Sequence, residues 1–278
     1  MTTVAIAVFG IVGAAAVLSL GLYAWAKAHT QARSQDPALK PPEEWAHDPL
    51  SAFIETARQN IFATFANLKS PYNRLRDIDR LFVRATENLH GLRDDADLLP
   101  ATFLLRAHSS YRGACQLALS GQLPEAYMVL RGCLENSLYG LFLYTHPEKA
   151  ETWPRRSDDD ASKRKVKAEF QVGPMLSLLD SKDAVTGKAV HGLYELTIDF
   201  GAHPNELALT SNARAENAKG ARRFELSYLT GDSTALRLCL KTTAQVGVGG
   251  LRIFRLIFRE RFELLEIPSA LQAVSQKL

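Results

Sequence analysis

"PEAYMVLRGCLENSLYGLFLY", which runs from Pro124 to Tyr144, decides the fold because it predicts a helix that buries most of its surface. Apolar side chains recur every three or four residues and fill a broad arc of this helix around Leu130: Leu123, Tyr127, Leu134, Leu138, Leu141 and Phe142. Arg131 falls inside the arc, and Glu135 follows one turn later at its edge. A buried charge is costly unless it is paired, so we expect both side chains to contact each other or neighbouring helices. Such a pair is either a tie between helices or part of a catalytic or ligand-binding pocket, and the sequence leaves both open.

The segments on either side of this stretch continue the helical pattern. Amphipathic helices are predicted at about 49–68, 71–93, 98–120 and 123–145, with Ser-Pro, Leu-Pro and Gly-Gln-Leu-Pro breaks between them. Short connections favour antiparallel neighbours, so the predicted fold class is mainly α, a helical bundle.

The second half of the chain adds helices and one change of pattern. A charged stretch from Arg155 to Lys167 predicts an exposed loop that leads into the next helix. The further predicted helices are one that is interrupted at Gly173-Pro174 and ends near Asp180, one at 183–200, one from Ser233 to about Glu266, and a short last one that Pro268 opens. Within 206–229, "ELALTSN" and "RFELSYL" alternate apolar and polar residues around "ARAENAKGA", which predicts a small β-hairpin.

A membrane segment is the strongest signal near the N-terminus. Residues 4–26 contain no charge and are long enough to span a bilayer as a helix. The rival interpretation is a cleavable secretory signal, but no Lys or Arg precedes the apolar run, which is also longer than a usual signal core. The sequence therefore favours a transmembrane anchor over residues 1–28, a proline-containing linker over 29–48 and a helical domain over 49–278.

The residues after the apolar run predict its orientation. Tyr23 and Trp25 lie where amphipathic rings favour the headgroup layer, and Lys27 and Arg33 follow on the same side. Positive residues favour the cytoplasmic side, so we expect a single-pass membrane protein with its N-terminus outside and its C-terminal domain in the cytoplasm.

Composition excludes little and supplies no cofactor motif. The formal net charge of +3 does not indicate a nucleic-acid-binding protein. Three cysteines, at 115, 133 and 239, lie in apolar helical patterns without CxxC spacing, so neither a disulfide framework nor a zinc site is indicated. "GVGG" at 247–250 lacks the preceding strand of a dinucleotide-binding motif, and close helix packing explains it better. We therefore predict neither a cofactor nor a metal.

Two histidines are candidate site residues. His108 shares a helix face with Tyr111 and Cys115, which favours a hydrogen-bonded core histidine. His203 follows Gly201 at the end of a predicted helix. It either caps that helix or faces Arg131 and Glu135 as a proton-transfer group.

A stripe of basic residues marks one side of the last long helix: Lys241, Arg252, Arg255 and Arg259. On an anchored domain this basic stripe could contact anionic lipid or an acidic protein, and the simpler interpretation is a solvated helix face. A nucleic-acid-binding surface is the least favoured use and would give steeply salt-dependent binding.

A family resemblance covers roughly residues 103–203. The matching positions are Gly121, Glu125, Ala126, Tyr127, Leu130, Arg131 and Glu135, followed by Tyr194 and His203. This pattern resembles a group of uncharacterised bacterial helical domains that look like relatives of HEPN-type bundles. The resemblance implies a helical bundle and supplies no reaction.

Some HEPN proteins are metal-independent ribonucleases with an Arg-x4–6-His motif. "RATENLH", from Arg84 to His90, has that spacing. It departs from the motif because Ala85 stands where a polar residue is usual and because it lies early in the bundle. The match is therefore a poor basis for predicting ribonuclease activity.

Two functions remain after these comparisons of pattern. The favoured one is a membrane-anchored cytoplasmic module that binds a protein partner or a second copy of itself. The alternative is a membrane-tethered hydrolase or HEPN-like nuclease that acts through Arg131, Glu135 and His203.

Overall fold

A computed structural model describes residues 41–89, 95–202, 206, 210, 213–218 and 221–278. The chain divides into two compact units, Met1–Ala52 and Phe53–Leu278. In the first unit, the Asp48 carboxylate accepts hydrogen bonds from the backbone N–H groups of Leu50 and Ser51, at 2.9 and 3.1 Å. These bonds satisfy donors that lack partners in the first turn of helix α2 (Pro49–Asn67).

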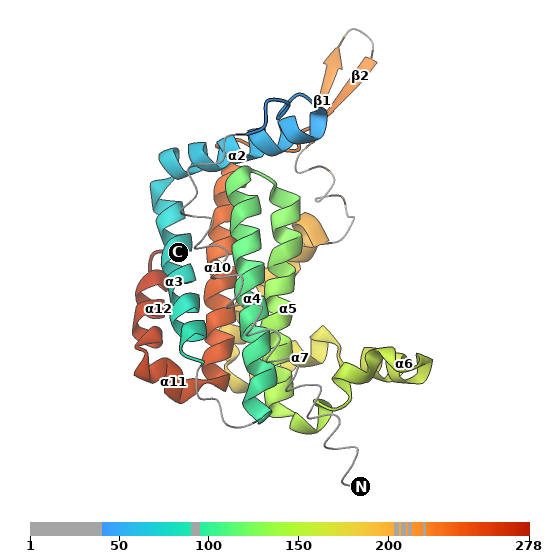
Figure 1. Ribbon diagram of the computed structural model, residues 1–278, viewed down its shortest axis with the longest axis vertical. Coiled ribbons are helices and arrows are strands. Elements are labelled where there is room, and N and C mark those ends of the chain that lie inside the picture. Colours follow the sequence, from blue (N-terminus) through green and yellow to red (C-terminus); the bar gives the residue numbers. More distant parts are fainter. Residues whose placement is uncertain (1–40, 90–94, 203–205, 207–209, 211–212, 219–220) are drawn as a thin grey trace. The chain divides into compact units, whose positions relative to one another are not determined.

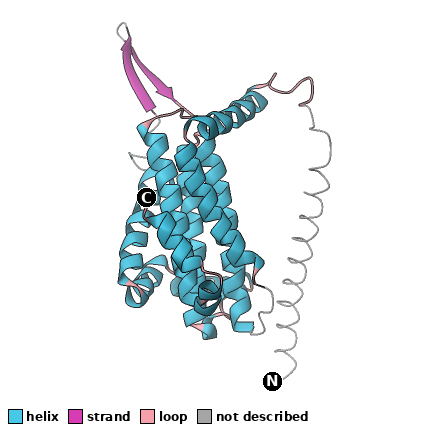
Figure 2. Ribbon diagram, turned by 90° about the vertical axis from the view of Figure 1, so that its left-hand side faces the viewer, coloured by secondary structure: helices cyan, strands magenta, loops and turns pink. Residues whose placement is uncertain are grey.

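The second unit is a helical bundle, as predicted (Figure 2). Its long helices are α3 (Lys69–Glu87), α4 (Asp95–Ser120), α5 (Leu123–Thr145) and α10 (Thr234–Ile257). Figure 1 shows α4 and α5 side by side, joined by a short turn, with α10 next to them. The core lies between these helices. The bounds of α2 and α5 agree closely with the helices predicted from sequence.

Shorter elements connect α5 to α10. They are the turns η1 (Pro147–Lys149) and η2 (Trp153–Ser157), the helices α6 (Asp160–Glu169), α7 (Val172–Lys182) and α8 (Ala184–Thr197), the π-helical turn η3 (Ile198–Ala202), and the strands β1 (Ala213–Ala218) and β2 (Ala221–Leu226). In Figure 1, α6 extends away from the four long helices. After α10 come α11 (Arg259–Leu264) and α12 (Ile267–Ser275), which packs on α3.

Three prolines lie inside helices where the sequence predicted breaks. Pro71 is the third residue of α3 and Pro174 the third of α7, where a missing N–H costs no intrahelical hydrogen bond. Pro100 lies within α4, which begins at Asp95. The break predicted at Gly173-Pro174 is therefore wrong, and the chain turns instead at Phe170 and Gln171.

The end of α3 and the end of α10 also differ from the prediction. Asn88 follows α3, and its side-chain amide donates to the Arg84 carbonyl at 2.8 Å, which closes the helix before the predicted residue 93. The long helix predicted to reach Glu266 breaks at Phe258. Phe258 and Phe262 are both buried, so the break turns these rings into the core.

The hairpin lies within the predicted region, but its strands are shifted. β1 and β2 pair antiparallel, with Ala213 opposite Leu226 and Ala218 opposite Ala221. The segment "ARAENA", predicted as the connection, is the first strand. Glu206 and Thr210, predicted in that strand, are helical, and the Thr210 hydroxyl donates to the Glu206 carbonyl at 2.7 Å.

The prediction of close packing at residues 247–250 is confirmed. A Cβ atom on Gly247 would lie 2.5 Å from Tyr111 Cε2 and 2.8 Å from Ile78 Cγ2. Any side chain at position 247 would clash with Tyr111 or Ile78, so only glycine there allows α10 to approach α3 and α4 this closely.

No helix among the described residues is long and apolar enough to cross a membrane. The predicted span at 4–26 lies outside those residues.

Candidate functional site

Arg131 and Glu135 contact each other, one turn apart on α5. Arg131 Nε donates to Glu135 Oε1 at 2.8 Å. Their side chains are 30% and 32% exposed, so the pair lies at the margin of the core and not inside it as the sequence pattern suggested. The structure therefore confirms the contact and corrects the burial.

Tyr194 on α8 completes this group, which we call the α5–α8 cluster: Arg131, Glu135 and Tyr194. The Tyr194 hydroxyl donates to Glu135 Oε1 at 3.0 Å. The guanidinium carbon of Arg131 lies 5.3 Å from the centre of the Tyr194 ring, within the range of a cation–π interaction. The cluster joins α5 to α8, and one carboxylate oxygen accepts both hydrogen bonds.

The protonation of the cluster is set by burial and by Glu135. Burial first, and then the nearby carboxylate, raise the pKa of Tyr194 to about 12. Partial burial opposes the charge on Arg131, but the hydrogen bond to Glu135 and the interactions with Tyr194 together outweigh burial and raise the pKa of the guanidinium. At neutral pH the tyrosine is a proton donor and the arginine a cation. Neither group is poised to exchange a proton near pH 7.

His108 belongs to a second group, the α3–α4 cluster: Asp79, His108 and Arg112. His108 Nε2 lies 2.7 Å from Asp79 Oδ1, and its ring stacks on Phe82 with centroids 5.1 Å apart and planes 6° from parallel. Arg112 donates through Nε and Nη2 to the two oxygens of Asp79, at 2.7 and 3.0 Å. The expectation of a hydrogen-bonded core histidine is confirmed, and its partner is a carboxylate on the neighbouring helix.

Asp79 is the residue on which the α3–α4 cluster depends. Burial acts to raise the pKa of its carboxyl, but the hydrogen bonds from His108 and Arg112 and their charges outweigh burial and lower the pKa to about 2. Asp79 is therefore ionised across the physiological pH range and holds two side chains of α4 against α3.

Other sequence candidates fall outside the described residues. His203 is one, so its predicted approach to Arg131 and Glu135 stays a prediction. His90 of the Arg-x5-His match is another, while Arg84 Nη1 donates to the Leu265 carbonyl at 3.0 Å. Within the described part of the chain, the contacts of His108 are with Asp79 and Phe82 and do not include Arg131 or Glu135.

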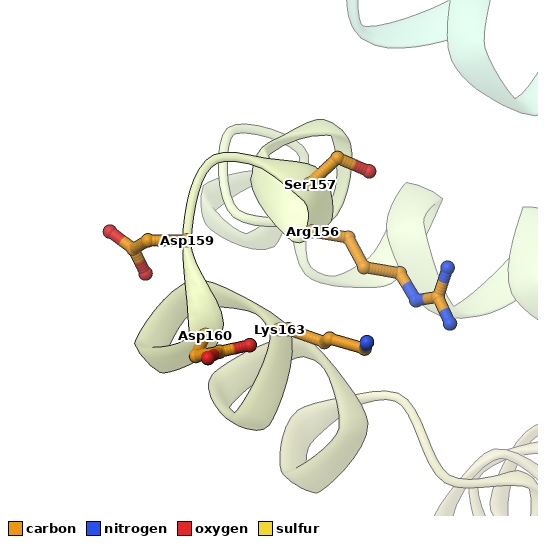
Figure 3. A pocket seen from close by; sticks show the side chains of 5 residues that line it. All are labelled: Arg156, Ser157, Asp159, Asp160 and Lys163. Carbon is orange, nitrogen blue, oxygen red and sulfur yellow. The ribbon is translucent and has the colours of Figure 1, made fainter.

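Two surface hollows are lined by residues that belong to neither cluster. The hollow in Figure 3 has a volume of about 510 Å³ and is lined by Arg156, Ser157, Asp159, Asp160 and Lys163. Figure 3 shows the side chains of Arg156 and Lys163 extending to one side and that of Asp159 to the other. Asp159 accepts from the Ser162 N–H at 2.7 Å, which makes it the cap of α6. A second hollow of about 520 Å³ lies beside the start of α3 and the C-terminus.

The predicted basic stripe is divided between two helices. Arg252 donates to the Ser275 hydroxyl of α12 at 3.3 Å, and Arg255 donates to Glu263 of α11 at 2.8 Å. Lys241 and Arg259 are exposed, and Arg259 lies beyond the break at Phe258. The stripe is therefore partly used in holding α11 and α12 against α10.

The cysteines are free thiols in the bundle. Cys133 and Cys239 are buried, and Cys115 is half-buried. Burial raises the pKa of each thiol to about 12, so none of them is a nucleophile at neutral pH. Across the described ranges, no group of three or more His, Cys, Asp or Glu side chains could hold a metal ion.

Sequence patterns did not identify Asp79 as a site residue. It lies in "RDIDR" on α3, where four of five residues are charged, and nothing local separates it from Asp77 two positions earlier. Tyr194 appeared only through the family resemblance. Hydropathy patterns place both on helices but do not show which neighbour they contact.

Comparison with known proteins adds no relative. No protein-family model, no curated protein and no solved structure matches the chain.

Proposed function

We propose that this protein is a membrane-anchored helical module whose cytoplasmic domain binds a partner protein. The observation that carries the proposal is that the candidate catalytic groups are engaged in contacts between helices. Arg131 and Glu135 join Tyr194 across α5 and α8, and Asp79 holds His108 and Arg112 across α3 and α4. Charged groups held in contacts between helices stabilise the fold. Binding of a partner then takes place at other surfaces of the domain.

The anchor of this module is the uncharged segment at residues 4–26. The linker at 29–48 gives the domain limited reach, because an extended chain spans at most about 3.5 Å per residue. The domain therefore begins, at residue 49, within roughly 70 Å of the membrane surface.

The segment 153–169, which comprises η2 and α6 and which we call the η2–α6 excursion, is the surface that best suits a protein partner. Its exposed basic residues are Arg155, Arg156, Lys163, Arg164, Lys165 and Lys167. Three acidic residues of the same stretch gather at the start of α6, where Asp159 caps the helix, and Glu169 lies at its end, 3.9 Å from Lys165. An excursion with this charge favours an acidic partner and speeds its association through electrostatic attraction.

Photo-crosslinking of the full-length protein in cells tests the proposal. A photoreactive residue at Arg164 on α6 is expected to give one discrete adduct of higher mass. Changing Lys163, Lys165 and Lys167 to Glu should reduce that adduct about fivefold or more, because opposite charge steers the encounter. The matched control places the same photoreactive residue at Glu260, an exposed position on α11, and should give no adduct.

The mass of the adduct identifies the partner class, since a doubled mass indicates a second copy of this chain. The alternative of a hydrolase or HEPN-like nuclease predicts a different result. It requires that the purified protein cleave an ester or a single-stranded RNA, and that Glu135→Gln abolish the cleavage while the protein stays folded. Absence of any adduct from position 164, together with such cleavage, would replace the module with the enzyme.

A further inference from the structure

α2 carries an apolar face that is exposed to solvent. Ile54, Phe62 and Phe65 are 43%, 57% and 50% exposed. At about 100° per residue, the three side chains lie within an arc of about 80° on one side of the helix. Three large apolar residues on one exposed arc are more than scattered surface hydrophobics, and they indicate a surface that is covered when the protein functions.

Hydrogen bonds show where the apolar face of α2 lies in the second unit. The side-chain amide of Asn60 donates to the Ser120 carbonyl at 3.1 Å, at the C-terminal end of α4. The next residue, Gly121, has a positive φ of 87° and accepts from the Thr230 N–H at 2.9 Å. Tyr228, which is 67% exposed, precedes this contact by two residues. α2 and a second exposed aromatic ring therefore lie at the end of the bundle where α4 turns into α5.

The opposite end of the bundle holds α11. Arg84 near the end of α3 donates to Leu265, and Arg261 donates to the Asn88 carbonyl at 2.9 Å. Arg255 and Arg259 of the basic stripe belong to this end. Figure 1 shows α2 and α11 at opposite ends of α3. A flat surface that covers α2 does not at the same time cover α11.

We propose that the apolar face of α2 rests on the lipid bilayer in which the predicted anchor is inserted. α2 is the first helix after the linker, so it is the part of the bundle tethered most closely to residues 4–26. A short tether raises the effective concentration of membrane at α2 into the millimolar range, which makes a weak interfacial contact sufficient. This inference rests on the membrane anchor of the proposed function and adds the surface by which the domain is oriented.

The chemistry of the face suits the headgroup layer. A helix that lies in the membrane interface carries Trp, Phe and Leu on its apolar face, and Phe62 and Phe65 supply two such rings. Arg58 lies in the same arc, with its guanidinium carbon 5.4 Å from the centre of the Phe62 ring and its side chain 54% exposed. The Arg58 guanidinium donates to both oxygens of Glu55, at 2.9 and 2.6 Å, so this ion pair lies at the polar level of the interface while the apolar stem of Arg58 stays with the rings.

The area of the face favours lipid over a second copy of the chain. Three side chains of this size, about half exposed, offer on the order of 300 Å². A stable protein dimer buries about 800 Å² on each partner. The apolar face of α2 is too small to hold two domains together and large enough to dock a domain that is already tethered.

Tryptophan quenching by brominated lipids tests this inference in the full-length chain. Phe62→Trp and Phe65→Trp are made separately, and Leu264→Trp on α11, where Leu264 is 84% exposed, is the matched control. Each variant is reconstituted in phosphatidylcholine–phosphatidylglycerol vesicles with and without bromine on the acyl chains. The signal is the difference from the parent chain, because Trp25, Trp45 and Trp153 are common to all. Co-flotation with the vesicles reports the anchor independently.

The expected result is a blue-shifted added emission at positions 62 and 65 that brominated lipid reduces about twofold or more, with less than about 10% change at position 264. Flotation without quenching at 62 and 65 overturns the inference and leaves the anchor standing. Quenching at 264 instead places the basic end on the membrane, and a blue shift without quenching means that protein covers α2. A parent chain that fails to float overturns both the anchor and the inference.

Discussion

The two ionic clusters of the bundle use similar groups in different surroundings. In the α5–α8 cluster, both charged side chains belong to one helix, and each is about a third exposed. In the α3–α4 cluster, Asp79 receives hydrogen bonds from a buried histidine and from an arginine on the neighbouring helix. The pair that was visible in the sequence is about a third exposed throughout, whereas the cluster around the unrecognised Asp79 combines a buried histidine with an arginine that is 57% exposed.

This difference shows that the ease with which a cluster is recognised in the sequence does not indicate how much the cluster contributes to the free energy of unfolding. A pair at positions i and i+4 is visible because its geometry is local, and exposed pairs of this kind contribute little. A carboxylate that holds two partners from another helix, one of them buried, contributes more because its loss leaves the buried histidine without its hydrogen-bond acceptor. Unfolding of the full-length protein in mild detergent measures that difference.

Asp79→Ala should have the largest effect. It removes the hydrogen-bond acceptor of buried His108 and of Arg112, and we expect a loss of about 3 kcal/mol in the free energy of unfolding. This value is at the low end for a broken buried pair because the Asp79 side chain is 29% exposed. Urea unfolding followed by far-ultraviolet circular dichroism measures it. Asp77→Ala, on the same helix in an exposed pair, is the control and should cost less than about 0.5 kcal/mol. Equal losses for the two variants would show that the buried histidine adds nothing.

The next largest effect should come from acid, which removes the contribution of Asp79 to the free energy of unfolding. Its carboxyl has a pKa of about 2 in the folded protein, against an ordinary value of 3.8. Because the folded pKa is lowered, the stabilisation is present above about pH 4 and is lost as the pH falls towards 2. It amounts to about 2 kcal/mol. The measurement is the difference in unfolding free energy between the parent and Asp79→Asn, followed from pH 5 downwards. A difference that stays constant down to pH 2.5 would contradict the assignment.

Glu135→Gln should cost less, about 1 kcal/mol or below. The substitution removes the negative charge next to Arg131 but keeps an oxygen that accepts from Tyr194, and the pair is screened by solvent. The same urea titration measures the loss. A loss above about 2 kcal/mol would mean that the α5–α8 cluster stabilises the fold about as much as the α3–α4 cluster does, and the contrast between the two clusters would disappear.

Salt should give the smallest effect. The two clusters should differ in how strongly salt changes their contributions to the free energy of unfolding. In 1 M NaCl the Debye length falls to about 3 Å, so the stability difference between the parent and Glu135→Gln should shrink by about 0.5 kcal/mol. The difference between the parent and Asp79→Ala should change by a smaller fraction, because hydrogen bonds to a buried ring are less screened. Equal salt dependence would mean that solvent reaches both clusters to the same extent.

The sequence predicted the local features of the bundle well. α2 and α5 have nearly the bounds that their apolar periodicity indicated, and Ser233 begins α10 as predicted, with its hydroxyl accepting from the Leu236 N–H at 3.1 Å. The hairpin was placed in the right region, but its strands were shifted. The alternation of "ELALTSN" was read as a strand, whereas Glu206 and Thr210 are helical. Short alternating runs are ambiguous between the two structures.

The candidate site was predicted only in part. The contact between Arg131 and Glu135 followed from their spacing, but the hydroxyl of Tyr194 comes from a residue 59 positions away. The partner of His108 lies 29 positions away on α3. Neither partner has a local signal, because many helical positions are equally polar and periodicity says nothing of how helices face each other.

By itself, then, the sequence determined where α2, α5 and α10 begin, which faces of the helices are apolar, and that Arg131 and Glu135 meet. These features depend on residues within one or two turns, and a helix repeats every 3.6 residues whatever lies around it. The tertiary structure alone decided that Asp79 binds His108, that α10 breaks at Phe258, and that α2 keeps Ile54, Phe62 and Phe65 exposed. Each of these depends on how whole helices pack, as at Gly247, where the approach of α10 to Tyr111 leaves no room for a side chain. Packing of this kind is a property of all the facing side chains together, and no single stretch of sequence contains it.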